Sequence, residues 1–273
     1  MRVVGGKKGK TDSAENEIKR RHRGNSQGNL TVVGIGPGDI SLLSRRAKEA
    51  IKRSRIIVGY AAYIKLIRAL VRGKEIFSSG MTRETERAAY AIKMAGRGND
   101  VCLVSSGDPG IYGMAGLALE LLKREDAKKI KLEVIPAITA AGACAALLGA
   151  PLSNDFAVIS LSDLLTERKE IERRLLAAAR GDFVIALYNP KSAKRTALLK
   201  KAWRIFSRYR KPNTPVGIVK NAYRDGQKII LTTLKDAGSI SDIDMTTTII
   251  VGNSKTRVKN GSMLTLRGYH VKN

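Results

Sequence analysis

The chain has 273 residues, which is enough for one large or two medium domains, and 43% of the residues are hydrophobic. It contains no apolar run of about 18 residues, so no transmembrane helix is expected. Its formal net charge of +26 predicts attraction to polyanions, which include nucleic acids, anionic membrane surfaces and small polycarboxylates, without choosing among them. Cys102 and Cys144 lie in apolar segments, which predicts buried thiols in a reducing compartment such as the cytoplasm rather than a disulfide framework. Because the two histidines lie near the chain ends, a zinc site or an iron–sulfur cluster is also disfavoured.

The first 29 residues are basic and have almost no apolar periodicity. They hold eight Lys and Arg against three Asp and Glu. Because this segment lacks the apolar core of a secretory signal, we expect a mostly disordered basic extension rather than a leader or a specific binding arm.

An apolar run at residues 30–36 predicts the first strand, which ends in the turn sequence GPGD. A dinucleotide-binding fingerprint would need its third glycine at position 39, where the chain has Asp39, and Pro37 lacks the backbone N–H group that a pyrophosphate would use. The spacing therefore disfavours nicotinamide or flavin binding and favours a rigid turn that faces another ligand.

Strands and helices then alternate, which is typical of a parallel sheet with helices on its faces. Thr82 is expected to cap the helix that follows it. We expect strands at residues 55–59, 75–77, 101–104 and 131–135, and helices at residues 41–52, 60–70, 82–95, 111–123 and 140–148.

The loop after the strand at 101–104 has the sequence SSGDPG and organises this half of the chain. In an α/β protein a ligand sits beyond the carboxyl end of a strand, and Gly107 and Gly110 would allow it to approach the backbone. The carboxylate of Asp108 would then accept hydrogen bonds from the ligand. The alternative is a plain strand–turn–helix connection in which Asp108 caps the helix.

A turn-rich break at residues 149–154 predicts a domain boundary. We expect an N-terminal α/β domain at residues 30–152 and a C-terminal α/β domain at residues 153–273, whose greater number of strands predicts a mixed sheet. The second half is expected to have strands at residues 156–161, 183–188, 215–220, 228–234 and 247–251, an edge strand within 262–271, and helices at 167–179 and from 190 to about 209.

The chain lacks a nucleophile elbow and a Walker loop. What recurs is a set of ligand-type loops, each after a strand and drawn from both halves. Such loops favour a transfer reaction in which a cofactor carries the chemistry and the protein positions two ligands.

Three motifs, GIGPGD (34–39), SSGDPGIYG (105–113) and PAITAA (136–141), resemble the signatures of the tetrapyrrole methylases. The resemblance implies two α/β domains with S-adenosylmethionine in the cleft between them. Five further segments resemble the precorrin-3B C17-methyltransferase family: VGYAAY (58–63), SSGMTRE (78–84), FAVISLSDLLT (156–166), LYNPKSAKR (187–195) and DMTTTIIVGNS (244–254).

This resemblance implies methyl transfer to C17 of precorrin-3B or cobalt-precorrin-3, with ring contraction, in cobalamin biosynthesis, by a homodimer that needs no metal or membrane. The catalytic residue stays unassigned. The implied cofactor-binding residues are Pro37, Ser106, Gly107, Asp108, Ile111, Thr139, Ala140, Asn189 and Ala222. The implied substrate-binding residues are Tyr60, Ser79, Met81, Thr82 and Arg83.

The chain departs from the family pattern in three places. Ala137 stands where the family usually has Gly, and a positive φ there would strain an Ala residue. Asn154 replaces a frequent His, which removes any acid–base role for that residue. Glu167 and Arg168 replace a common Pro-Trp pair, which would reshape one rim of the cleft.

Two other functions stay open. The first is a methylase of the same superfamily that acts on another precorrin, on a protein side chain or on ribosomal RNA, which the net charge of +26 would suit. The second is a non-catalytic basic RNA-binding protein. The intact cofactor loops and the aromatic content of only 5% make nucleic acid the less favoured partner.

Overall fold

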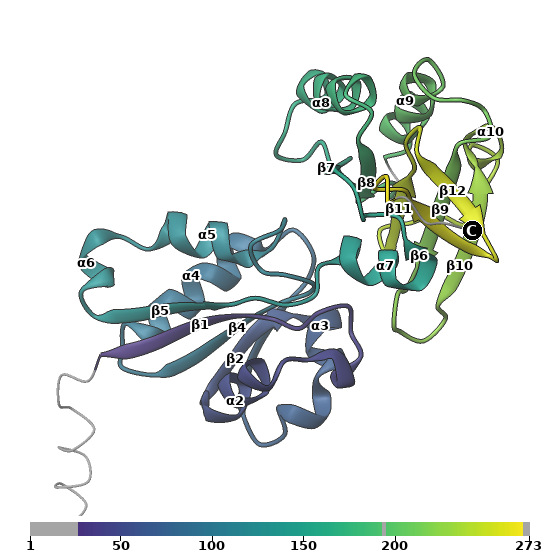
Figure 1. The fold of residues 1–273 in the computed structure, drawn as a ribbon. Helices are drawn as coiled ribbons and strands as arrows, with labels where there is room; N and C mark the ends of the chain where they lie inside the picture. The colour runs from purple at the N-terminus through teal and green to yellow at the C-terminus, as the bar shows by residue number, and fades with distance from the viewer. Residues whose placement is uncertain (1–26, 193–194, 270–273) are drawn as a thin grey trace, which may run out of the picture.

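The computed structural model describes residues 27–192 and 195–269. The predicted basic extension lies outside the described residues apart from its last three. Two five-stranded sheets, each with helices packed on it, occupy the two ends of the molecule, and a smaller three-stranded sheet adjoins the second (Figure 1). The α/β architecture predicted from the sequence is confirmed.

The first sheet is entirely parallel, with strand order β3-β2-β4-β1-β5. Successive side chains alternate between its faces: in β1, Val32 joins one core cluster and Val33 joins the other. Helices cover both faces (Figure 1), and the three central strands β1, β2 and β4 are almost continuously buried, whereas the edge strands β3 and β5 carry exposed residues. The strands are β1 (Gly28–Gly34), β2 (Ile56–Tyr60), β3 (Glu75–Ser79), β4 (Asp100–Ser105) and β5 (Ile130–Ile135). One face carries α4 (Glu84–Ala95) and α5 (Met114–Leu121), and the other carries α2 (Arg45–Arg53) and α3 (Ala61–Leu66).

Short helical turns complete this half. They are η1 (Ile40–Leu42), η2 (Arg68–Leu70) and α6 (Arg124–Ala127). The predicted helix at 41–52 is therefore two elements, because Ser44 interrupts it with extended backbone and caps α2 by accepting a hydrogen bond from Ala47 N at 3.1 Å.

The second sheet is mixed, as predicted, with strand order β10-β9-β11-β8-β7. The pair β7–β8 is parallel and the remaining pairs are antiparallel. The strands are β7 (Phe156–Ser160), β8 (Val184–Tyr188), β9 (Pro215–Lys220), β10 (Lys228–Thr233) and β11 (Thr247–Val251).

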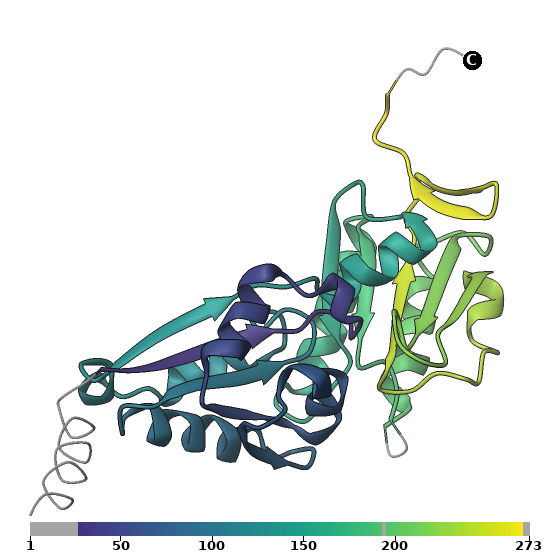
Figure 2. The same cartoon turned by 90° about the horizontal axis from the view of Figure 1, so that it is seen from below.

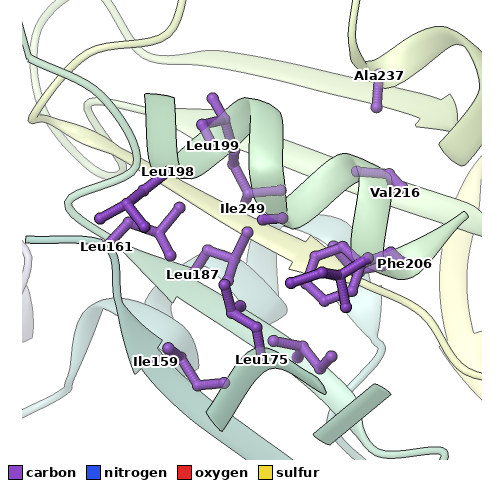
Figure 3. Packing of buried hydrophobic residues seen from close by; sticks show 14 of the residues in the cluster. Ile159, Leu161, Leu175, Leu187, Leu198, Leu199, Phe206, Val216, Ala237 and Ile249 are labelled. Atoms are coloured by element: carbon purple, nitrogen blue, oxygen red, sulfur yellow. The ribbon is translucent and has the colours of Figure 1, made fainter. Parts of the chain in front are cut away.

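Helices α8 (Arg168–Arg180) and α9 (Ala197–Phe206) cover one face of the second sheet, together with the short α10 (Leu234–Ala237). Their apolar residues form the largest buried cluster, in which Phe206 is fully buried against residues that include Leu175 and Val216 (Figure 3). Trp203, which is the one tryptophan of the chain, packs against this cluster.

The opposite face of the second sheet is covered by α7 (Ala140–Leu148), although α7 follows the last strand of the first sheet. Cys144 and Leu148 of α7 cluster with Val184, Val219 and Ile250 of the second sheet. The predicted boundary between residues 152 and 153 places α7 in the first domain, so its packing differs from the expected division. The domain limits stay a prediction.

The C-terminal segment differs from the predicted edge strand. β13 (Ser262–Thr265) pairs antiparallel with β12 (Thr256–Lys259) and parallel with the two-residue β6 (Gly149–Ala150), which makes a separate three-stranded sheet. The strand ends at Thr265, and residues 270 and 271 of the predicted strand lie outside the described residues.

Two local predictions need correction. β1 begins at Gly28, two residues earlier than expected, because residues 28 and 29 already pair with β5. Thr82 does not cap α4: its backbone has φ 64°, the helix begins at Glu84, and the Thr82 hydroxyl donates to the carbonyl oxygen of Met81 at 2.6 Å.

None of the helices in the described part of the chain combines the length and the apolar character that crossing a membrane requires.

Truncating a fully buried side chain in the largest hydrophobic cluster, which packs on the second sheet, should destabilise the protein. We expect Phe206→Ala to lower the free energy of unfolding by about 3–5 kcal/mol, because a fully buried ring leaves a cavity. Phe156→Ala is the control, since Phe156 is 45% exposed, and it should cost less than about 1 kcal/mol. Urea unfolding followed by Trp203 fluorescence measures both. Equal losses would contradict this description of the core.

Candidate functional site

A cleft of about 320 Å³ lies between the carboxyl ends of the first-sheet strands and the second sheet. Figure 2 shows the strands of the first sheet running toward the second sheet, and loops that follow these strands supply lining residues of the cleft. All nine residues predicted to bind the cofactor are among its lining residues: Pro37, Ser106, Gly107, Asp108, Ile111, Thr139, Ala140, Asn189 and Ala222. The structure brings them together from both halves, and their binding role stays a prediction.

Backbone pairing joins the loops after β1 and β4. Gly36 N donates to Gly107 O at 3.2 Å, and Gly107 N donates to Gly36 O at 2.9 Å. Both glycines have positive φ, 65° and 61°, which a residue with a side chain rarely adopts. Gly34 precedes this pair, and a Cβ atom there would lie 2.7 Å from Ala137 Cβ and from Pro109 Cδ. Glycine is therefore required where the loops meet.

Asp108 ties a third loop to these two. Its Oδ1 accepts a hydrogen bond from Gly110 N at 2.8 Å, and its Oδ2 accepts one from Ala137 N at 2.9 Å. The carboxylate does not cap α5, whose N-cap is Gly113. The alternative of a helix cap is therefore wrong, because the side chain bridges from its own turn to the turn after β5.

Ala137 carries no backbone strain. It is absent from the positive-φ residues, so the substitution of Ala for the family's usual Gly is compatible with this turn. The concern raised by the sequence does not apply, because the turn is held by the hydrogen bond to Asp108 rather than by a left-handed backbone.

Two tyrosines that were not among the predicted site residues fix the elements around the cleft. The hydroxyl of Tyr188, at the end of β8, accepts from Ala141 N at 2.6 Å and pairs with the Thr139 hydroxyl at the start of α7. The hydroxyl of Tyr112 donates to Val158 O at 3.1 Å and accepts from Ser160 N at 3.2 Å on strand β7. Burial raises the pKa of Tyr188, so its phenol stays protonated near neutral pH.

Left-handed backbone recurs around the cleft outside the glycines. Tyr112, Asn189 and Asn221 line the cleft and have φ of 52°, 51° and 50°. Asn tolerates this conformation, whereas Tyr is strained by it, and such strain is concentrated at functional sites. Asn189 is fixed by a hydrogen bond from its Nδ2 to the Ser160 hydroxyl at 2.9 Å.

The five residues predicted to bind substrate separate into two groups. Tyr60 and Met81 line the cleft. Ser79, Thr82 and Arg83 are not among the lining residues: the buried Ser79 hydroxyl accepts from Arg87 Nη1 at 2.9 Å, and Arg83 pairs with Glu86 at 2.7 Å. The structure therefore brings two of the five to the cleft, and the substrate role of all five stays a prediction.

Arg224 is a cleft residue that the sequence reasoning missed. It follows β9 of the second sheet, yet its Nε donates to Pro37 O and its Nη2 donates to the Ser106 hydroxyl at 2.9 Å. Burial lowers its pKa. Its sequence context, NAYRDGQ, holds no periodicity that points to a buried cation, and an arginine in a chain with 50 basic residues carries little signal by itself.

Both cysteines are buried and unbonded, as predicted. Burial raises the pKa of the Cys102 thiol to about 12 and that of Cys144, which lines the cleft, to about 11. Thiols with such pKa values stay protonated at neutral pH and are poor nucleophiles. Within the described ranges, no group of three or more His, Cys, Asp or Glu residues is arranged to hold a metal ion.

The arrangement suits the positioning of ligands. Tyrosine rings, glycine backbone and hydrogen-bonded loops line the cleft, and none of the residues described above is an activated nucleophile. Such a site accelerates a reaction by holding two ligands in the correct relative orientation and by excluding water.

The family model for "Tetrapyrrole (Corrin/Porphyrin) Methylases" matches residues 29–238. The chain is 46% identical over 240 residues to the "Probable cobalt-factor III C(17)-methyltransferase" of Salmonella typhimurium, which covers 88% of this chain and 99% of that relative. It is 49% identical over 249 residues to the "Cobalt-factor III methyltransferase" of Priestia megaterium, a match that covers 90% of this chain and 46% of the longer relative. The chain thus spans about half of the Priestia protein.

A solved structure, "Crystal structure of the methyltransferase CobJ", superposes with a TM-score of 0.83 at 36% identity. The superposition covers 88% of this chain and all of the solved one.

Asp108→Asn should destabilise the protein in the absence of any ligand. An asparagine side chain can accept from Gly110 N or Ala137 N but not from both, because one oxygen becomes an NH₂ group. The lost hydrogen bond should lower the free energy of unfolding by about 1–3 kcal/mol. Asp155→Asn is the matched control, since Asp155 is exposed, and it should change stability little. Chemical denaturation of the three proteins would refute this role of Asp108 if both variants matched wild type.

Proposed function

The chain belongs to the tetrapyrrole methylase family, and on this premise we propose that it is an S-adenosylmethionine-dependent methyltransferase of cobalamin biosynthesis. It transfers a methyl group to C17 of precorrin-3B or of its cobalt-loaded counterpart, with contraction of the macrocycle. The observation that carries the proposal is the 46% identity to the Salmonella typhimurium relative over 99% of that protein's length.

The described residues fit the methyl donor. Tyr60, Tyr63 and Tyr112 line the cleft, and aromatic faces and carbonyl oxygens attract a sulfonium cation. The donor supplies an electrophilic methyl group. The loops tied by Gly36, Gly107 and Asp108 hold one wall of its site, and the ends of β8 and β9 hold the other.

The protein contributes position rather than a nucleophile. The tetrapyrrole ring carbon is itself the nucleophile, so the enzyme has to align it with the methyl group and keep water out. The many acetate and propionate groups of the tetrapyrrole also suit a chain with a net charge of +26. We assign no catalytic acid or base, since the buried thiols are protonated and Asp108 is committed to backbone N–H groups.

Methyl transfer provides the direct test. Purified protein incubated with radiolabelled S-adenosylmethionine should transfer one methyl group to each molecule of cobalt-factor III or precorrin-3B. Uroporphyrinogen III is the control tetrapyrrole and ribosomal RNA is the control polyanion, and neither should be labelled. Label in RNA alone would favour the alternative of a methylase of the same superfamily that acts on ribosomal RNA, and absence of any S-adenosylhomocysteine binding would overturn the proposal.

We also propose that the protein is a homodimer in the cytoplasm. Family resemblance supports the dimer, as do Leu164 and Leu165, which are 63% and 100% exposed on the loop between β7 and α8. The two free buried thiols support the location. Cell fractionation tests the location, and recovery of the chain outside the cytosolic fraction would contradict it.

Sedimentation equilibrium should give twice the chain mass of 29.7 kDa at micromolar concentration. Leu165→Ser should shift the equilibrium toward monomer, because it removes exposed apolar surface. Leu119→Ser is the control, since Leu119 is 55% exposed on α5 of the first half. A wild-type monomer in moderate salt would contradict the dimer.

A further inference from the structure

Arg224 crosses the cleft from the second half to the first. Its Nε donates to the carbonyl oxygen of Pro37, and its Nη2 donates to the Ser106 hydroxyl at 2.9 Å. These two acceptors belong to the loops after β1 and β4. The guanidinium is consequently fixed in the wall of the cleft rather than free to point into solvent.

The positive charge of Arg224 has no partner carboxylate among the described residues. None of their carboxylate oxygens lies within salt-bridge distance of it. Asp108 also lines the cleft, but both of its oxygens accept from backbone N–H groups. A partly buried cation without an anion is costly, and burial lowers its pKa.

One edge of the guanidinium remains available. Arginine has five N–H donors in a planar fork, and the Nε–Nη2 edge is occupied by Pro37 O and the Ser106 hydroxyl. Within the part of the chain that the structure describes, Nη1 has no hydrogen-bond partner. The Nη1–Nη2 edge still presents one N–H group from each nitrogen, and two such parallel N–H groups can pair with a carboxylate.

We propose that Arg224 is the carboxylate-binding residue of the cleft. The proposal rests on the proposed function, which brings two carboxylate-bearing ligands to this cavity. The carboxylate comes from the amino-acid part of the methyl donor or from an acetate or propionate group of the tetrapyrrole. Arg224 contacts Pro37 and Ser106, which are predicted cofactor residues, and its charge also acts on Tyr63, which lines the same cleft.

This role explains why the residue is arginine. A lysine ammonium is a point charge without a second planar edge, so it could not hold Pro37 O and Ser106 while presenting a paired edge to a carboxylate. Gly38 makes room for the side chain, because a Cβ atom at that position would lie 2.8 Å from Arg224 Nε.

The test uses two pairs of ligands that differ in carboxylate groups. The first pair is S-adenosylhomocysteine and its decarboxylated analogue. The second is cobyrinic acid and its heptaamide. Calorimetry gives the affinity of each ligand for wild type, Arg224→Gln and Arg224→Lys. Arg97→Gln is the control, because it removes the same charge from an exposed turn before β4, at the opposite end of that strand from the cleft.

Wild type should bind the carboxylate-bearing member of at least one pair about 10- to 150-fold more tightly. Arg224→Gln should abolish that preference, Arg224→Lys should keep a small part of it, and Arg97→Gln should keep all of it. Loss of preference in the first pair identifies the donor carboxylate, and loss in the second identifies a tetrapyrrole side chain. The Lys variant keeps the charge and so serves if the Gln variant fails to fold.

The proposal is overturned if Arg224→Gln and Arg224→Lys keep the wild-type preference. It is also overturned if they lower the affinity for both members of each pair equally, because Arg224 would then only stabilise the contact between the halves. If wild type binds none of the four ligands, the proposed function fails and this proposal fails with it. Wild-type binding with an unchanged preference in the variants refutes this proposal alone.

Discussion

The backbone pairing of Gly36 with Gly107 is the contact on which the rest of the cleft depends. The two reciprocal hydrogen bonds bring the loops after β1 and β4 together just beyond the sheet edge. The loops can pair because Gly36 and Gly107 adopt positive φ and because Gly34 has no side chain that would clash with Ala137 and Pro109. Asp108 then fixes the turn after β5 to this pair. Three loops thereby become one rigid wall.

The opposite wall is attached to this one by a few polar side chains. Each of the larger hydrophobic clusters belongs to one sheet, and the smallest, with Ala141, Ala186 and Tyr188 as its buried members, joins α7 to the second sheet. Tyr112 and Arg224 reach across with hydrogen bonds to β7 and to the first-half loops, and Tyr188 holds the start of α7 against the second sheet. A cleft joined in this way keeps its polar groups near the ligands instead of burying them in a shared core.

Much of the fold could be predicted from the sequence, because apolar runs bounded by Gly, Pro and Asn carry a strong local signal. The bounds of α7, β9 and β11 match the prediction at both ends. The role of Thr82 as a helix cap was mispredicted because a cap depends on where the helix backbone begins. Thr82 itself has left-handed backbone, and the helix begins at Glu84. The nine predicted cofactor residues lie together because each follows a strand end. Tyr188 belongs to one of the predicted ligand-type loops, but its bond to Thr139, 49 residues away, and the role of Arg224, whose partner Pro37 is 187 residues away, could not be predicted from local sequence.

Hydrogen exchange with and without S-adenosylhomocysteine tests most directly whether the methyl donor occupies this cleft. The account predicts slower amide exchange in residues 105–113, 136–141, 187–190 and 221–224, with no change in the β12–β13 hairpin. Protection confined to the outer faces of α8 and α9, with the four loops unchanged, would contradict it.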